Sequence, residues 1–153
     1  MGSNVDFLHG QLLVGLVISL ECIAVHAVIM ALVSWTAHRT SRAVQAAWVS
    51  ARLILVMMAA VTVLMTAHVI EIAIWGLSYA ALNVVPDQAD SFYFAFVNYT
   101  TLGYGDTLPV KRWRLLGPMA AMNGVLLFGW STAVIYDVLR SVAQVIPMRP
   151  SSG

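Results

Sequence analysis

Three long apolar runs, residues 12–35, 53–85 and 115–139, limit what this sequence can fold into. A helix that crosses the hydrocarbon core of a membrane needs about 20 mostly apolar residues, and each run exceeds that length. Few ionisable side chains interrupt the runs: Glu21 and His26 in the first, His68 and Glu71 in the second, and Asp137 in the third. We therefore predict an all-α membrane protein with three transmembrane helices.

The composition supports this prediction. Hydrophobic residues make up 60% of the chain and charged residues only 10%, whereas about a quarter of the residues of a soluble domain are charged. The net charge of +1 gives no reason to expect a nucleic-acid partner. Cys22 is the single cysteine, so an intrachain disulfide is excluded. A signal peptide is disfavoured because the first run lacks a basic leader, is too long and contains Glu21.

The charges outside the apolar runs predict the orientation. The segment 36–52 carries four basic or titratable side chains, His38, Arg39, Arg42 and Arg52. Short basic loops stay in the cytoplasm, so we expect the N-terminus outside and the C-terminus inside. Three further cations would then lie outside, against the rule: Lys111, Arg112 and Arg114. We accept this exception because they directly follow a segment that does not cross the membrane.

That segment, residues 90–102, is apolar and aromatic but too short to span a membrane. Twelve helical residues from Ser91 would rise about 18 Å, roughly half the hydrocarbon core. Asp87, Asp90 and Ser91 suit a helix N-terminus. A half-membrane helix followed by irregular backbone is tolerated only where protein or a water-filled cavity surrounds it. The pattern predicts a re-entrant pore helix and a pore loop.

The loop sequence, residues 100–106, reads Thr-Thr-Leu-Gly-Tyr-Gly-Asp. Its alternating glycines allow backbone conformations in which successive carbonyls point to one side. Four such loops around an axis would replace the water shell of a cation with rings of carbonyl oxygens. The preceding helix would aim its partially negative C-terminus at the same place. We predict ion binding by residues of this filter: Thr101 (also through its hydroxyl), Leu102, Gly103, Tyr104 and Gly105.

Residues 54–139 resemble the pore unit of potassium channels in their outer helix, pore helix, filter and inner helix. The filter string, Pro109 and the inner-helix string from Gly124 to Gly129 carry the resemblance, and Gly124 aligns with the family's hinge glycine if one residue is deleted before it. The extra first helix resembles small bacterial ion-channel proteins. The resemblance implies a homotetramer in the bacterial plasma membrane, with K⁺ at Thr101, Leu102, Gly103 and Tyr104 as permeant ion and no other cofactor.

Some positions differ from the family pattern. Leu102 replaces the usual Val, Tyr93-Phe94 replaces a Trp pair, and Val97 stands where some members have Glu. We expect Tyr93 to hydrogen-bond Asp106 and Asn98 to support the Tyr104 hydroxyl. The predicted filter-support residues are thus Tyr93, Asn98, Thr100 and Asp106. Looser bracing would affect how stably the filter conducts rather than its ion preference.

Helical spacing places four inner-helix residues on one face: Val125, Phe128, Thr132 and Tyr136. By the resemblance this face lines the cavity and Gly124 is the hinge. The alternative for each residue is a lipid or helix contact, and Asn123 is compatible with either position.

The intramembrane side chains Glu21, His26, His68 and Glu71 need partners, because a charge at this depth costs about 2.5–3.5 kcal/mol. We expect an interhelical polar network that positions the first helix; a zinc site and a pH sensor are alternatives. Counting inward from Trp35 and Leu53 places Glu21 and His68 at the same level. We therefore predict a Glu21–His68 pair, with the first helix packed on the outer helix.

The sequence thus predicts a first helix with its basic linker at 1–52, a pore domain at 53–140 and a short tail at 141–153. The predicted function is passive, potassium-selective conduction, without enzymatic chemistry, by a homotetramer among membrane lipids. A weakly selective cation channel and a non-conducting scaffold or accessory subunit are the alternatives. Arg39 and Arg42 alone do not make a voltage sensor, so we expect leak-like gating or gating at the filter.

Overall fold

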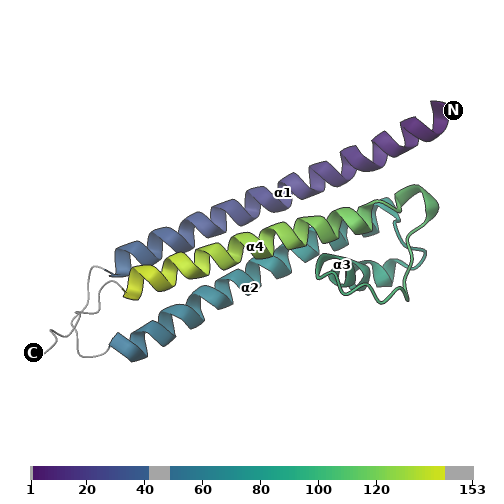
Figure 1. Ribbon diagram of the computed structural model, residues 1–153. Helices are drawn as coiled ribbons and strands as arrows, with labels where there is room; N and C mark the ends of the chain where they lie inside the picture. Colours follow the sequence, from purple (N-terminus) through teal and green to yellow (C-terminus); the bar gives the residue numbers. More distant parts are fainter. Residues whose placement is uncertain (1, 42–48, 144–153) are drawn as a thin grey trace, which may run out of the picture.

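The computed structural model describes residues 2–41 and 49–143. Four α-helices follow one another: α1 (Gly2–Ser41), α2 (Val49–Leu82), α3 (Ser91–Tyr99) and α4 (Leu116–Ala143) (Figure 1). Two short 3-10 turns, Gln88–Asp90 and Lys111–Trp113, precede α3 and α4. The described residues contain no strand, so the predicted all-α class is confirmed. Arg42 and residues 144–153 of the predicted tail lie outside the described residues.

The three long helices lie side by side, and each contains a stretch long and apolar enough to cross a membrane (Figure 1). These stretches are Phe7–Thr36 in α1, Leu53–Leu82 in α2 and Lys111–Ser141, which begins in the 3-10 turn before α4 and ends within α4. The helix α1 packs against α4 as well as against α2. The prediction that the first helix packs on the outer helix was therefore incomplete, because α1 also contacts the inner helix.

The short helix α3 packs against α2 and α4 near one end of the bundle (Figure 1). It has nine residues, three fewer than predicted, and rises about 14 Å. Asp87 acts one turn earlier than expected, since its carboxylate accepts the Ala89 N–H at 3.0 Å and caps the 3-10 turn. The helix ends at Tyr99 because Thr101 adopts a left-handed backbone, with φ of 61°.

Two clusters of buried apolar side chains hold the helices together. The larger surrounds α3 and includes Trp75, Tyr79, Phe94, Tyr99 and Leu116. The smaller joins α1, α2 and the C-terminal part of α4, and includes Met30, Leu64 and Val138. Large hydrophobic side chains are also exposed on all three long helices, as expected for helices surrounded by lipid tails or by other helices.

Hydrogen bonds at the end of α2 fix the two ends of the pore loop. Asn83, with φ of 51°, ends α2, and the Val84 N–H returns to the Tyr79 carbonyl at 2.9 Å. Beyond the loop, the Val110 N–H donates to the Val84 carbonyl at 2.8 Å and the Trp113 indole donates to the Leu82 carbonyl at 3.0 Å. The chain therefore returns to the end of α2 before α4 begins.

Candidate ion-conduction site

Every second residue of the segment 100–106, beginning with Thr101, has a positive backbone φ. Positive φ angles occur at Thr101 (61°), Gly103 (57°) and Gly105 (77°), but not at the residues between them. Glycine adopts this conformation at little cost. Thr101 is the demanding case, because a β-branched side chain rarely adopts it and a left-handed non-glycine residue costs about 1–3 kcal/mol. Such strain is concentrated at functional sites.

The amide groups of this loop are tethered to the end of α3. The N–H groups of Leu102 and Gly103 both donate to the Val97 carbonyl, at 2.9 and 3.2 Å. In a planar trans peptide the N–H and the preceding C=O point in opposite directions. The carbonyls of Thr101 and Leu102 therefore point away from α3.

Every residue from 101 to 106 is exposed in the single chain, including two large side chains, Leu102 at 53% and Tyr104 at 67%. The predicted ion-binding residues thus form one continuous exposed segment rather than a pocket enclosed by their own chain.

Two of the predicted supporting contacts can be compared directly with the structure. The Tyr93 hydroxyl donates to the Asp106 carboxylate at 2.6 Å, as expected, and this bond raises the pKa of Tyr93 to about 12. The Asn98 amide donates to the Phe94 carbonyl at 2.7 Å within its own helix, so support of Tyr104 by Asn98 stays a prediction. The Thr100 hydroxyl caps α3 by donating to the Phe96 carbonyl at 2.7 Å.

Gly124 lies where α4 crosses the end of α3. A Cβ atom on Gly124 would lie 2.1 Å from the Tyr99 carbonyl oxygen, and one on Gly117 would lie 2.8 Å from the Asn98 side-chain oxygen. Small residues allow two membrane helices to approach this closely. The helix α4 runs through Gly124 without interruption, so the structure gives Gly124 a packing role, and its predicted role as a hinge stays a prediction.

The other predicted cavity residues are exposed along α4: Val125, Phe128, Thr132 and Tyr136. Phe128 has a second role, because its ring lies 4.5 Å from the His68 ring and 5.5 Å from the Tyr99 ring. Phe128 thus lies against His68 and Tyr99, which belong to a buried cluster of polar side chains. That these residues line a cavity stays a prediction.

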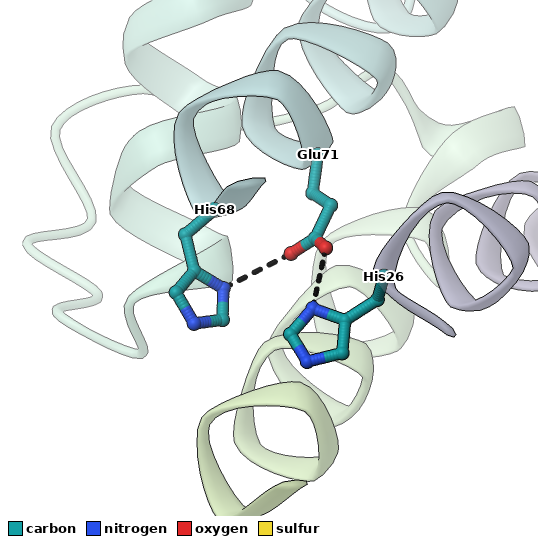
Figure 2. A group of neighbouring side chains, drawn as sticks. All are labelled: His26, His68 and Glu71. Carbon is teal, nitrogen blue, oxygen red and sulfur yellow. Dashed lines mark hydrogen bonds and ion pairs between the residues drawn. The ribbon is translucent and has the colours of Figure 1, made fainter. Parts of the chain in front are cut away.

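The buried cluster joins three of the four predicted intramembrane side chains (Figure 2). The Glu71 carboxylate lies between two imidazoles, 2.7 Å from His26 Nδ1 and 3.0 Å from His68 Nδ1. His26 comes from α1, whereas His68 and Glu71 are one turn apart on α2. These hydrogen bonds tie α1 to α2 through three of the four predicted members of the network.

The predicted Glu21–His68 pair is wrong. Glu21 is exposed, and His68 contacts Glu71, Tyr99 and Ser131 instead. The pairing assumed that helix ends coincide with the ends of the apolar runs and that the helices have little tilt. Counting from the observed helix ends at Ser41 and Val49 would still place His68 level with residue 22. The pairing therefore fails because α1 is displaced along α2 and because Glu21 lies on an exposed face.

Two members of the cluster were missed by the sequence analysis. The Tyr99 hydroxyl donates to the Glu71 carboxylate, and the Ser131 hydroxyl lies 3.0 Å from His68 Nε2 and 3.4 Å from His26 Nε2. The one available signal was the position of Tyr99 directly before the filter threonines. Identifying its partner required the relative positions of three helices.

Comparison with known families gives one match. A family model described as an ion channel matches residues 54–141, which include α3, the filter loop and almost all of α2 and α4. Searches of the curated proteins and of the solved structures gave no significant match. The match covers more than half of the chain and agrees with the three apolar helices and the re-entrant loop. The chain therefore belongs to the ion channel family, whose members are integral membrane proteins that move ions without enzymatic chemistry.

Proposed function

We propose that this chain is one subunit of a homotetrameric, potassium-selective channel whose filter is formed by residues 101–105. The observation that carries the proposal is the alternation of backbone handedness at Thr101, Gly103 and Gly105. Together with the tether of two amides to the Val97 carbonyl, it leaves successive carbonyls free on one side of the loop. Carbonyl oxygens arranged in rings replace the hydration shell of K⁺.

The same geometry supports an assembly of four chains. One strand cannot surround an ion, and all of its residues are exposed in the single chain. Four copies around an axis would cover Leu102 and Tyr104 and place the carbonyls and the Thr101 hydroxyl around the ion path. The proposed setting is a bacterial plasma membrane, with the N-terminus outside and the C-terminus in the cytoplasm, as the basic residues after α1 favour.

The proposal is tested by reconstituting the purified protein in a bilayer with unequal K⁺ and Na⁺ concentrations. We expect a solution mass of four chains, a reversal potential near that of K⁺, and block by Ba²⁺, which has a similar size and twice the charge. Tyr104→Asp should shift the reversal potential toward that of Na⁺, because a charged, shorter side chain cannot reproduce the packing that holds the upper carbonyls.

The exposed Glu21 provides a matched control, since Glu21→Gln alters a distant carboxylate and should leave the reversal potential unchanged. A wild-type reversal potential set equally by Na⁺ would replace the proposal with a weakly selective cation channel. A tetramer that carries no current would indicate a scaffold or accessory subunit.

A further inference from the structure

The buried cluster behind the filter contains a carboxylate with three donors. Glu71 is fully buried and faces His26 Nδ1 at 2.7 Å, His68 Nδ1 at 3.0 Å and the Tyr99 hydroxyl. An ionised carboxylate only accepts hydrogen bonds, and three donors directed at one carboxylate stabilise the ionised form. An ionised Glu71 requires a proton on the Nδ1 atom of each imidazole, and these are the two nitrogens joined to its carboxylate in Figure 2.

The Nε2 atoms, on the opposite side of each imidazole ring, determine how many further protons the cluster holds. Both Nε2 atoms face one hydroxyl, that of Ser131, at 3.0 Å from His68 and 3.4 Å from His26. A serine hydroxyl donates one hydrogen bond and accepts up to two. With two neutral imidazoles, one buried Nε2 would lack a donor, which is unfavourable.

One additional proton satisfies every group. An imidazolium donates its Nε2–H to Ser131, and Ser131 donates its own proton to the other imidazole. The positive charge also balances Glu71, which a buried carboxylate in a membrane requires. The remaining neighbours are the Cys22 thiol of α1, 3.8 Å from the Glu71 carbonyl, and the rings of Trp130 and Phe128. None of these side chains supplies a competing charge.

The cluster is directly connected to the filter. Tyr99 is the last residue of α3, its side chain is fully buried, and its hydroxyl is held by Glu71. Its backbone lies against α4 at Gly124. Thr101, the first filter residue, follows two positions later, so a displacement of the Tyr99 side chain would move the end of α3 to which the filter amides are bonded.

We propose that Glu71 is a positioning residue for ion conduction: paired with one imidazolium shared by His26 and His68, its carboxylate holds Tyr99 and thereby the first residues of the filter. This inference rests on the proposed function and adds to it a role for α1, which reaches the filter through His26. A divalent metal is the competing occupant, because the ligand atoms of the three residues lie within 4.8 Å of one another. Hydrogen bonds of 2.7 and 3.0 Å favour the proton.

The charge state is tested by ¹⁵N spectroscopy of histidine-labelled protein in bilayers, with His9→Gln and His38→Gln removing the other two histidines. We expect signals that account for one imidazolium in two rings near neutral pH. Glu71→Gln should convert both rings to neutral imidazoles. Two neutral rings in the otherwise unchanged protein would overturn the inference, as would stoichiometric Zn²⁺ binding that shifts both rings and is reversed by a chelator.

The functional part is tested by single-channel recording of Tyr99→Phe and Glu71→Gln. Tyr99→Phe keeps the ring and its packing but removes the hydroxyl. Because a hydrogen bond to a charged group is lost, we expect a roughly tenfold rise in the ratio of closed to open time, with an unchanged tetramer mass. Glu21→Gln, outside the cluster, should behave as wild type.

The outcomes separate this inference from the proposed function. If the wild-type protein does not conduct K⁺ selectively, the proposed function fails. If it conducts selectively and Tyr99→Phe and Glu71→Gln have wild-type closed and open times, only the positioning role of Glu71 fails.

Discussion

At Gly124 the helix α4 passes so close to the end of α3 that a side chain has no room. A Cβ atom there would lie 2.1 Å from the Tyr99 carbonyl oxygen, which belongs to the backbone and cannot rotate away. We predict that Gly124→Ala separates the two helices and destabilises the protein by about 1–3 kcal/mol. Thermal denaturation of the detergent-solubilised protein measures this effect as a lower midpoint.

Gly129, five residues later on α4, is the matched control, because a Cβ atom there would have no neighbour within 4 Å. Gly129→Ala should leave the midpoint unchanged or raise it slightly, since alanine favours a helix. Equal midpoints for the two variants would contradict the packing role of Gly124. A change in conduction at unchanged stability would point to the hinge role instead.

The backbone conformation of the proposed filter could be predicted at the residue scale because its requirements are local. Glycine at every second position shows where the backbone needs a positive φ, and the structure has positive φ at Gly103 and Gly105. The Tyr93–Asp106 bond was also predictable, because both residues belong to the short segment between α2 and α4. The left-handed conformation of Thr101 was not predictable, since its residue type disfavours it.

At the scale of the helices, the existence and order of the elements could be predicted, but their register could not. Counting inward from Trp35 and Leu53 puts Glu71 level with residue 17, whereas its partner is His26, nine residues or about 14 Å further along α1. Counting from the observed helix ends at Ser41 and Val49 changes the expected level only to residue 19. The remaining difference is a displacement of α1 along α2, and side-chain packing determines this displacement.

The packing of α1 on α4 is tested at Gly15. A Cβ atom on Gly15 would lie 2.3 Å from the Met119 sulfur and 3.2 Å from a Leu116 methyl carbon. Gly15→Leu should push the two helices apart and lower the free energy of unfolding by about 1–3 kcal/mol. The measurement is again the midpoint of thermal denaturation in detergent.

Gly10 provides the comparison on the same helix, because no atom lies within 4 Å of a Cβ built there. Gly10→Leu adds the same side chain where its Cβ atom meets no neighbour, so its midpoint of thermal denaturation should be close to that of the wild type. If both leucine variants have the same midpoint, α1 does not pack on α4 through Gly15.

At the scale of the whole molecule, α3 and the proposed filter lie near one end of the helix bundle, so the two ends of the bundle differ. The N-terminal part of α1 lies at the same end of the bundle as α3, whereas the C-terminal end of α1 and the N-terminal end of α2 lie at the opposite end (Figure 1). In the proposed channel, the filter therefore opens to the side on which α1 begins. Which side of the cell this is depends on the basic residues that follow α1, because short basic loops stay in the cytoplasm.

Cysteine labelling of intact cells tests this orientation. With Cys22 replaced by serine, Ser3→Cys at the beginning of α1 should react with a membrane-impermeant thiol reagent added from outside. Ser41→Cys at the end of α1 should react only after permeabilisation, because we expect the basic loop to lie in the cytoplasm. The same reagent applied to inside-out vesicles should give the opposite pattern, which controls for differences in thiol reactivity. If Ser41→Cys reacts in intact cells and Ser3→Cys does not, the filter opens to the cytoplasm and the predicted orientation is inverted.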